Sequence, residues 1–329
     1  MRILITGVGS LLAQGIIKSI KKSNINCYLI GTDYFASSVG LYWVDNGYIL
    51  PDILSPKVKS KVWIDNLIDI INKEKIDVVI PGLDFEIPIL SQKKELIEDS
   101  TKSTVVVSSK EVVGIGDDKW ETVKYLKKNG FNYPKSSLPS NLREFIKSNS
   151  FPYIVKPRFG HTSKNVFLVN NKIELEKAVN ICDKPIVQEY LVKEDNEYTC
   201  SSTFVNGNLL TTICLRRVLK NGNTQIAFSE STVGLDKYII SVTKSIKPFG
   251  AINYQLRETD DGPVIFEINP RFSGTTPIRA IFGVNEVEAV LRAICNEDYD
   301  YSYSKIEGVV QRYFENQFIS LEKYNKYLS

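Results

Sequence analysis

The sequence predicts a mixed α/β and α+β fold, with an N-terminal doubly wound parallel-sheet domain followed by a two-lobed region of antiparallel sheets. Three observations support this prediction. Apolar strands alternate with amphipathic helices through the first third of the chain, long strands joined by tight turns fill the second half, and 329 residues suffice for two or three domains. Strands that alternate with helices usually pair in parallel, whereas strands joined by tight turns pair antiparallel.

The first third is expected to contain strands separated by helices. Short apolar runs predict the strands, and apolar residues at helical spacing, such as Leu12, Ile16 and Ile20, predict the helices. The expected strands span residues 2–7, 27–33, 76–82 and 104–109, and the expected helices span 9–23, 62–75 and 88–99.

From about residue 112 the pattern changes to shorter helices and antiparallel strands. Hairpins are expected to turn at Asn206-Gly207 and at residues 260–262. The elements expected before them are helices at 117–130 and 173–182 and strands at 152–157, 165–169 and 185–191. The predicted division is a first domain over 1–112, a small subdomain over 113–187 and a large subdomain with a C-terminal tail over 188–329.

The composition is that of an ordinary globular protein and argues against several functions. The net charge is +3, and no Lys/Arg block forms the footprint expected for nucleic-acid binding. Five scattered cysteines without a CxxC pair argue against a zinc site and a secreted disulfide scaffold. Without a long apolar run or a signal peptide, we expect a cytoplasmic protein that does not enter a membrane. A single histidine, His161, disfavours histidine-based chemistry.

The second hairpin is expected to have one polar face. The core face should carry Val264, Phe266 and Ile268, and the other face Ile265, Glu267 and Asn269. A solvated hairpin face is the simplest interpretation. The composition favours a binding face instead, because a carboxylate and amides converge there. Arg271 follows just past the strand, where its guanidinium could donate to a phosphoryl oxygen.

The partner strand adds another amide to this face. If residues 260–262 form the turn, Thr259 lies opposite Pro263 and Gln255 lies opposite Glu267. Mg²⁺ takes oxygen ligands, usually one or two carboxylates together with substrate phosphates. The hairpin therefore predicts a site for metal ions that are bound to a nucleotide's phosphates.

Two lysines stand where a bound anion would stabilise them. Lys119 lies in the first turn of a helix, where an anion would offset the unfavourable dipole, although it could also be a surface lysine held by neighbouring aspartates. Lys156 interrupts an apolar strand and needs a partner, unless it reaches solvent at the strand end. The polar connection that follows it, 158–165, could cover phosphates with its backbone N–H groups.

Taken together, these segments resemble the ATP-grasp superfamily in order and spacing. They are Lys119, YIVKPRFG at 153–160, IVQEYL at 186–191, NEYTCSS at 196–202, INYQLR at 252–257 and FEINPRFSG at 266–274. The closest resemblance is to the branch of biotin carboxylase and the carbamoyl-phosphate synthase large subunit. The first domain also resembles the one that precedes ATP-grasp domains. The resemblance implies that ATP and Mg²⁺, or Mn²⁺, are cofactors and that the small subdomain is a lid.

The resemblance also implies a role for each matching residue. The implied nucleotide-binding residues are Lys119 and Lys156 at the phosphates, Gln188, Glu189 and Tyr190 beside the adenine, and Glu197 at the ribose. The implied metal ligands are Gln255, Glu267 and Asn269, and the implied catalytic residues are Arg271 and Lys156.

The chain departs from the family pattern in two places. The phosphate-covering loop keeps only Gly160, followed by His161, Thr162 and Ser163. Gly274 stands where the carbamoyl-phosphate synthase pattern has a second arginine that handles bicarbonate, so bicarbonate is in doubt as a substrate. Arg279 could substitute only if the next turn folds back. Because an amidotransferase partner domain is also missing, we do not expect a true carbamoyl-phosphate synthase.

The first domain carries features of its own. Gly7, Gly9 and Gly15 suggest a dinucleotide fingerprint, but Gly15 comes too late, and tight packing explains the other two without NAD. Asp84 and Glu86 follow the third strand, at the edge where open α/β sheets bind ligands. They could bind a substrate amine, or they could be acids favoured at a helix N-terminus.

These features lead to the hypothesis of an ATP-dependent carboxylate–amine ligase. It would activate a small carboxylate as an acyl phosphate and transfer it to an amine, with release of ADP and phosphate. Arg216 or Arg217 would bind the carboxylate of the acid substrate. The alternatives are a carbamoyl-phosphate-synthase-like nucleotide-binding protein with a regulatory or lost catalytic role, and an NAD-linked oxidoreductase. The expected partners are small molecules, and the resemblance suggests a homodimer.

Overall fold

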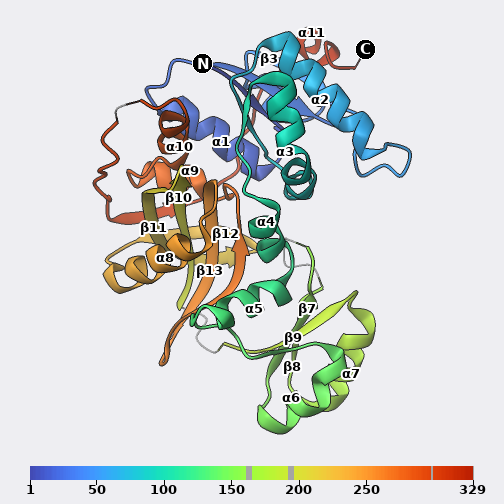
Figure 1. The fold of residues 1–329 in the computed structure, drawn as a ribbon, viewed down its shortest axis with the longest axis vertical. Coiled ribbons are helices and arrows are strands. Elements are labelled where there is room, and N and C mark those ends of the chain that lie inside the picture. Colours follow the sequence, from blue (N-terminus) through green and yellow to red (C-terminus); the bar gives the residue numbers. More distant parts are fainter. Residues whose placement is uncertain (161–164, 192–195, 298, 329) are drawn as a thin grey trace.

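The N-terminal domain is built on a parallel sheet. The structure, a computed structural model, describes residues 1–160, 165–191, 196–297 and 299–328. Within these residues the first sheet has the strand order β3-β2-β1-β4-β5, and every pairing is parallel (Figure 1). The strands are β1 Arg2–Ile5, β2 Tyr28–Asp33, β3 Asn46–Ile49, β4 Val78–Ile80 and β5 Thr104–Val105. β3 was not predicted, because its sequence NGYI contains no apolar run.

Helices cover both faces of this sheet. Ile3 and Ile5 of β1 pack with α1, whereas Leu4 between them packs with α2 and α3, as a doubly wound sheet requires. The N-terminus of α1 is fixed by Ser10, whose Oγ accepts a hydrogen bond of 3.0 Å from the Ala13 N–H. The elements are α1 Leu11–Lys22, α2 Ser60–Glu74 and α3 Ile87–Thr101, with short 3₁₀ turns η1 Val39–Tyr42 and η2 Asp84–Glu86.

A second, small sheet lies at the opposite end of the molecule (Figure 1). Its strand order is β6-β9-β7-β8, with antiparallel pairing. Tyr153 and Val155 of β7 pack against the helices α6 and α7 on one face, so Ile154 and Lys156 point to the other face. The elements are β6 Ser136–Ser137, β7 Tyr153–Pro157, β8 Phe167–Val169, β9 Pro185–Glu189, η3 Pro139–Asn141, α6 Leu142–Ser148 and α7 Lys172–Ile181.

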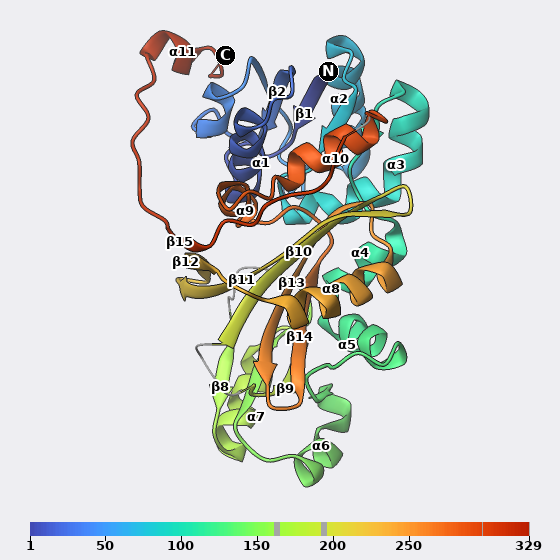
Figure 2. The same cartoon turned by 90° about the vertical axis from the view of Figure 1, so that its left-hand side faces the viewer.

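A third, larger antiparallel sheet lies between these two regions, in the order β14-β13-β10-β11-β12-β15 within the described residues. Helix α8 packs on one face through Leu235 and Ile239. Helices α9 and α10 contact α1 of the first domain, and α4 and α5 lie along β14 (Figure 2). The strands are β10 Glu197–Val205, β11 Asn208–Lys220, β12 Asn223–Ser229, β13 Gly250–Thr259, β14 Gly262–Asn269 and β15 Gly308–Gln311. The helices are α4 Lys110–Asp117, α5 Lys119–Lys128, α8 Val233–Ile246, α9 Thr276–Ile281 and α10 Glu286–Ile294.

The C-terminal segment returns to the first domain. After β15 it runs along the outside of the molecule to a short helix, α11 Leu321–Asn325 (Figure 2). There the ring of Tyr324 stacks on that of Tyr42, with centroids 6.3 Å apart. The sequence pattern gave no indication of this return.

The predicted pairing of the second hairpin is correct at Gln255 but wrong at its turn. Thr259 pairs with Gly262 and not with Pro263, because the turn has two residues. A register shift between Gln255 and Leu256 then adds one residue to β14 and places Gln255 opposite Glu267. The two differences compensate each other.

This irregularity also exchanges two side chains between the faces. Ile265, predicted on the polar face, is fully buried in the core with Leu256. Phe266, predicted in the core, instead lines the cleft beside Glu267. Simple alternation fails here because the extra residue of a bulge moves the next side chain to the other face.

The predicted fold class is confirmed. A parallel sheet in the first domain precedes antiparallel sheets in the rest of the described chain. The exact division at residues 112 and 187 stays a prediction. In the described residues, no helix has the length and apolar character needed to cross a membrane.

Candidate functional site

A cleft of about 480 Å³ lies between the small sheet and the large sheet. It is enclosed by β7 and β9 on one side and by β10, β11, β13 and β14 on the other. Many of the residues that the sequence singled out meet there, although they lie far apart in the chain. Those that line the cleft are Lys119, Lys156, Gln188, Glu189, Tyr190, Glu197, Arg217, Gln255 and Glu267.

One end of the cleft carries the two predicted lysines. Lys119 follows the N-cap Asp118, whose carboxylate accepts from the Trp120 N–H and pairs with Arg158. The Nζ of Lys119 donates to the Gly160 carbonyl at 2.8 Å, so this lysine already binds the start of the loop predicted to cover phosphates. The middle of that loop, residues 161–164, lies outside the described residues.

Lys156 is buried beside an aromatic ring. It is 8% exposed, and its Nζ lies 5.5 Å from the centroid of the Phe266 ring. Burial, and then the neighbouring positive charge of Lys119, lower the pKa of Lys156 to about 8. An anion bound here would therefore be strongly favoured, because it would compensate a buried cation.

Of the three predicted metal ligands, the two amides, Asn269 and Gln255, converge on the carboxylate of Glu267. Asn269 Nδ2 donates to Glu267 Oε1 at 2.9 Å, and Gln255 Nε2 approaches the same oxygen at 3.5 Å. Both amides thus turn their N–H₂ groups to Glu267, and each must rotate to offer its oxygen to a cation. One carboxylate and two amide oxygens suit Mg²⁺ that also binds phosphate oxygens. Among the described residues there is no cluster of three or more His, Cys, Asp or Glu that could hold a metal by itself.

The other end of the cleft is organised by Glu197. Its Oε1 accepts from Arg217 at 2.6 Å, and its Oε2 accepts from Arg257 at 2.9 Å. Arg217 also donates to Gln255 Oε1 at 2.9 Å, which connects this end to the candidate metal ligands. The Arg257 guanidinium lies 5.4 Å from the centroid of the Tyr190 ring.

The predicted adenine-side residues form the rim between β9 and β6. The Gln188 amide donates to Ser136 Oγ at 2.9 Å, so it fixes β6 on β9. Glu189 Oε1 accepts from the Lys135 N–H at 2.7 Å. The three residues thus lie together on this rim, and their role beside an adenine stays a prediction.

Arg271 and Asp84 contact each other outside the lining of this cleft. Arg271 Nε donates to Asp84 Oδ1 at 2.7 Å, which joins the end of β14 to the carboxyl edge of the parallel sheet. This edge is where ligands bind in open α/β sheets. The ion pair thus keeps the predicted substrate residue Asp84 next to the predicted catalytic residue Arg271.

Two substrate predictions need correction. Glu86 is fully buried, accepts hydrogen bonds from Thr6 and Tyr34, and has a pKa raised by burial to about 7, so its side chain does not face a substrate. Arg216 pairs with Glu230 at 2.7 Å and does not line the cleft, because it alternates with Arg217 along β11. The residues that bond to the buried Glu86, Thr6 and Tyr34, lie just after β1 and β2 and far from Glu86 in the sequence.

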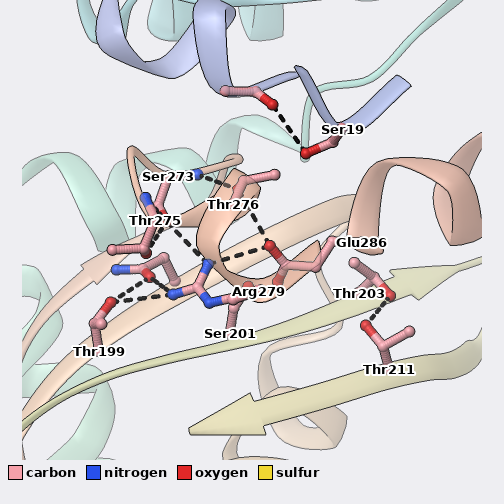
Figure 3. A network of polar contacts seen from close by, with 12 residues as sticks. Ser19, Thr199, Ser201, Thr203, Thr211, Ser273, Thr275, Thr276, Arg279 and Glu286 are labelled. Atoms are coloured by element: carbon pink, nitrogen blue, oxygen red, sulfur yellow. Dashed lines mark hydrogen bonds and ion pairs between the residues drawn. The ribbon is translucent and has the colours of Figure 1, made fainter. Parts of the chain in front are cut away.

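Arg279 does not replace a second substrate arginine. It is fully buried, and its guanidinium donates to Asn253, Thr199, Ser273 and Glu286 at 2.6 to 3.1 Å (Figure 3). This network adjoins the candidate metal ligands, because Asn253 pairs directly with Asn269 and paired side chains lie on the same face of the sheet.

The glycines of the first domain are explained by packing. A Cβ at Gly7 would lie 2.3 Å from the Leu83 side chain, and a φ of +57° favours glycine there. A Cβ at Gly9 would lie 2.6 Å from Ser38 Oγ. Asp33 accepts from the Gly9 N–H and from Ser38, so its carboxylate serves this turn. The geometry agrees with the prediction that these glycines do not need NAD.

Sequence reasoning missed several parts of the cleft. Phe266, Leu219 and Ile154 supply its apolar walls. Arg257 lay on the predicted polar face, but its pairing with Glu197 required the contact between β10 and β13. The polar alternation of Asn253, Gln255 and Arg257 along β13 indicated the face of Arg257, whereas β10, with Glu197 as its one charged residue, gave no signal for the pair.

The fold and the cleft define an α/β domain followed by two antiparallel sheets that face one binding cleft. Residues 116–275 match the sequence model of the ATP-grasp domain, and residues 3–106 match that of the PylC-like N-terminal domain. Residues 116–275 therefore form an ATP-grasp domain, which confirms the resemblance seen in the motifs.

Two curated relatives match parts of the chain. An uncharacterised protein of Mycoplasma genitalium is 41% identical over 111 residues, which are 33% of this chain and 37% of that protein. The carbamoyl phosphate synthase large chain of Saccharolobus islandicus is 25% identical over 282 residues, which are 78% of this chain and 26% of that protein. The chain thus spans well under half of the length of either relative.

Solved structures show the same fold. N5-carboxyaminoimidazole synthetase from Staphylococcus aureus, in complex with ADP, superposes with a TM-score of 0.73 at 16% identity, over 93% of this chain and 80% of that one. The biotin carboxylase domain of the Hydrogenobacter thermophilus 2-oxoglutarate carboxylase, with MgADP and bicarbonate, gives 0.73 at 15% identity, over 94% of this chain and 73% of that one.

Proposed function

We propose that this protein is an ATP-dependent carboxylate–amine ligase that uses Mg²⁺, with Mn²⁺ as a possible replacement. The observation that carries the proposal is the convergence of Lys119, Lys156, Glu267 and Gln255 on one cleft. The fold is that of structures that hold ADP or MgADP, which supports the assignment of a nucleotide to this cleft.

In this proposal the cleft holds the nucleotide along its length. The adenine lies against the rim, which is formed by Gln188, Glu189 and Tyr190. The ribose lies against Glu197. Lys119 and Lys156 bind the phosphates, where the charge of each lysine is matched by a phosphate oxygen. Glu267 and the rotated amides of Asn269 and Gln255 would hold Mg²⁺, which would supply charge stabilisation at the phosphates. The small sheet acts as the lid that excludes water.

The chemistry then proceeds by positioning and charge stabilisation. A substrate carboxylate oxygen attacks the γ-phosphorus, the bond from that phosphorus to the β–γ bridging oxygen breaks, and ADP leaves. Lys156 and Arg271 offset the charge on the transferring group. An amine then attacks the acyl carbon, loses a proton, and displaces phosphate. The substrates are small molecules, and Asp84, which pairs with Arg271, is our candidate for contact with the amine.

The proposal is tested by incubating the protein with Mg-ATP and a mixture of L-amino acids and measuring phosphate release. We expect release that depends on the mixture and that falls at least about a hundredfold in Lys156→Ala, because a preorganised charge is lost. Lys147→Ala, whose ion pair with Glu144 is exposed and away from the cleft, is the matched control and should keep the wild-type rate. Tight Mg-ATP binding without turnover on any carboxylate would support the regulatory alternative instead.

The pH dependence of nucleotide binding should follow Lys156. The free protein has a Lys156 pKa of about 8, below its ordinary value, and bound phosphates raise that pKa again. Binding of Mg-ADP therefore takes up a proton above pH 8, and the affinity falls as the pH rises through that value, whereas below it the affinity is flat. Calorimetry in buffers of different ionisation heat measures the uptake. Lys156→Arg, which stays charged, should remove the decline, and an unchanged profile would contradict the assignment.

We also propose that the protein is a homodimer, as the resemblance to its family suggests. Light scattering of the purified chain at several concentrations gives the mass directly. A mass of one chain throughout would reject the dimer without affecting the ligase proposal.

A further inference from the structure

The large sheet has one covered edge and one open edge. Helices α4 and α5 lie along β14 at one end of the sheet, whereas β15 at the other end pairs with β12 alone among the described residues. Figure 2 shows β15 at the side of the molecule, with the chain after it running along the outside. A strand with an unpaired edge offers its backbone N–H and C=O groups to a further strand.

The backbone groups of β15 alternate between the covered and the open side. The Arg312 N–H donates to the Gln225 carbonyl of the strand β12 at 2.9 Å. Because the backbone groups of successive residues in an antiparallel strand point to opposite sides, those of Val309 and Gln311 point away from β12. Two residues two positions apart thus present donors and acceptors on the open side, which is the spacing that one more antiparallel strand requires.

The side chains around this edge are apolar and exposed. Val309 is 60% exposed and Tyr313 is 81% exposed, and Ile306 and Phe314 are exposed beside them. Single exposed apolar residues are ordinary, but a group of them within residues 306–314, next to an open strand edge, marks a surface that another chain covers.

The edge is complementary to a second copy of itself. A twofold axis perpendicular to the sheet at Val309 sets Val309 opposite Val309 of the second copy, and Glu307 opposite Gln311 on the same face. The two valines then cover each other, and each Gln311 amide can donate to a Glu307 carboxylate. Across residues 304–314 this register places no two like charges opposite each other, so the self-pairing meets no charge repulsion.

The apolar surface is large enough for a dimer contact. In this register Tyr313 and Phe314 lie beside residues 304–306 of the second copy, where Ile306 is exposed. Two exposed aromatic rings of roughly 150–250 Å² each, with the exposed parts of Ile306 and Val309, offer about 600 Å² per copy. Stable interfaces begin at roughly 1,200 Å² for both partners together, which two such surfaces reach.

We propose that β15 pairs antiparallel with β15 of a second copy about a twofold axis at Val309, so that the two large sheets join into one. Tyr313 and Phe314 pack at the ends of this contact. The inference gives the proposed homodimer a specific interface and does not depend on the ligase function. Of the described residues that line the nucleotide cleft, none belongs to the segment 306–314, so the pairing leaves the cleft open.

The first test measures the mass of the full-length protein by analytical ultracentrifugation over a range of concentrations. We expect two chains in the wild type. Gln311→Pro removes an N–H on the open side, and Val309→Lys sets two cations opposite each other, so each should raise the Kd of the dimer at least about tenfold. Leu168→Lys, on the edge strand β8 of the small sheet, is the control and should keep the wild-type Kd.

Circular dichroism shows that each variant is folded before its mass is interpreted. A wild-type mass of one chain at every concentration would overturn the proposal. A dimer with the same Kd in Gln311→Pro, Val309→Lys and the wild type would overturn it as well, because the interface would then lie elsewhere.

The second test locates the contact with a short bismaleimide cross-linker and peptide mapping by mass spectrometry. Val309→Cys should give a covalent dimer linked between the two copies at position 309. Leu168→Cys, equally on an edge strand, is the matched control and should not link through position 168. The unmodified protein shows the background from the partly exposed Cys27 and Cys295. Links at position 168 as frequent as those at position 309 would overturn the proposal.

Discussion

Replacing Arg279 with methionine is expected to lower the free energy of unfolding by about 3–5 kcal/mol, the range for breaking a buried ion pair. Arg279 and Glu286 are both fully buried, and the guanidinium also holds Asn253 and Thr199 (Figure 3). Without Arg279, the Glu286 carboxylate loses its cation in the interior, and the oxygen acceptors on β10 and β13 lose their donor. Urea unfolding followed by circular dichroism measures the change.

Two further variants show whether the buried charge is the cause. Adding Glu286→Leu to Arg279→Met should recover part of the lost stability, because the uncompensated charge is removed. Arg292→Met breaks more exposed ion pairs with Glu288 and Glu297 and should cost no more than about 1 kcal/mol. If Arg279→Met were as mild as Arg292→Met, the network would not have the stabilising role that its burial implies.

Replacing Glu267 with glutamine should lower kcat for phosphate release by at least about a hundredfold, because Mg²⁺ supplies several kcal/mol of charge stabilisation to such reactions. Glu267 is the one carboxylate of the candidate metal set, and Asn269 and Gln255 both approach the same oxygen. A glutamine keeps the size of the side chain but removes its charge. Steady-state rates at several Mg²⁺ concentrations should also show a weaker dependence on the metal.

The matched control for this variant is Glu230→Gln. Glu230 pairs with Arg216, which does not line the cleft, and it is 44% exposed. Its loss should leave the rate unchanged, with thermal unfolding confirming that both variants fold. Full activity in Glu267→Gln would show that this carboxylate does not hold the metal.

Much of the fold and of the cleft could be predicted because they depend on local patterns. A lysine that interrupts the apolar strand β7 singled out Lys156, and strand–helix alternation identified the parallel sheet. The turn at Asn206-Gly207 has positive φ values of 50° and 84°, as its two residue types indicate. Gln255 met Glu267 through two compensating differences, a shorter turn and a bulge.

The rest depended on contacts between distant segments. Glu86 is buried by Thr6 and Tyr34, which lie in other parts of the first domain, so its position after a strand suggested an exposed acid. The bulge that turns Phe266 into the cleft is a backbone irregularity that alternation does not reveal. Arg312 reaches Gly274 only because the chain after α10 adds β15 to the sheet edge.

The central claim is that the cleft between the two antiparallel sheets binds a magnesium nucleotide through Lys156 and Glu267. Calorimetric titration of the full-length protein with Mg-ADP at pH 7 tests it most directly. We predict one site per chain in the wild type and at least about tenfold weaker binding in Lys156→Ala and in Glu267→Gln, since each loses a charge-assisted contact. No binding by the wild type, or equal affinity in all three proteins, would contradict it.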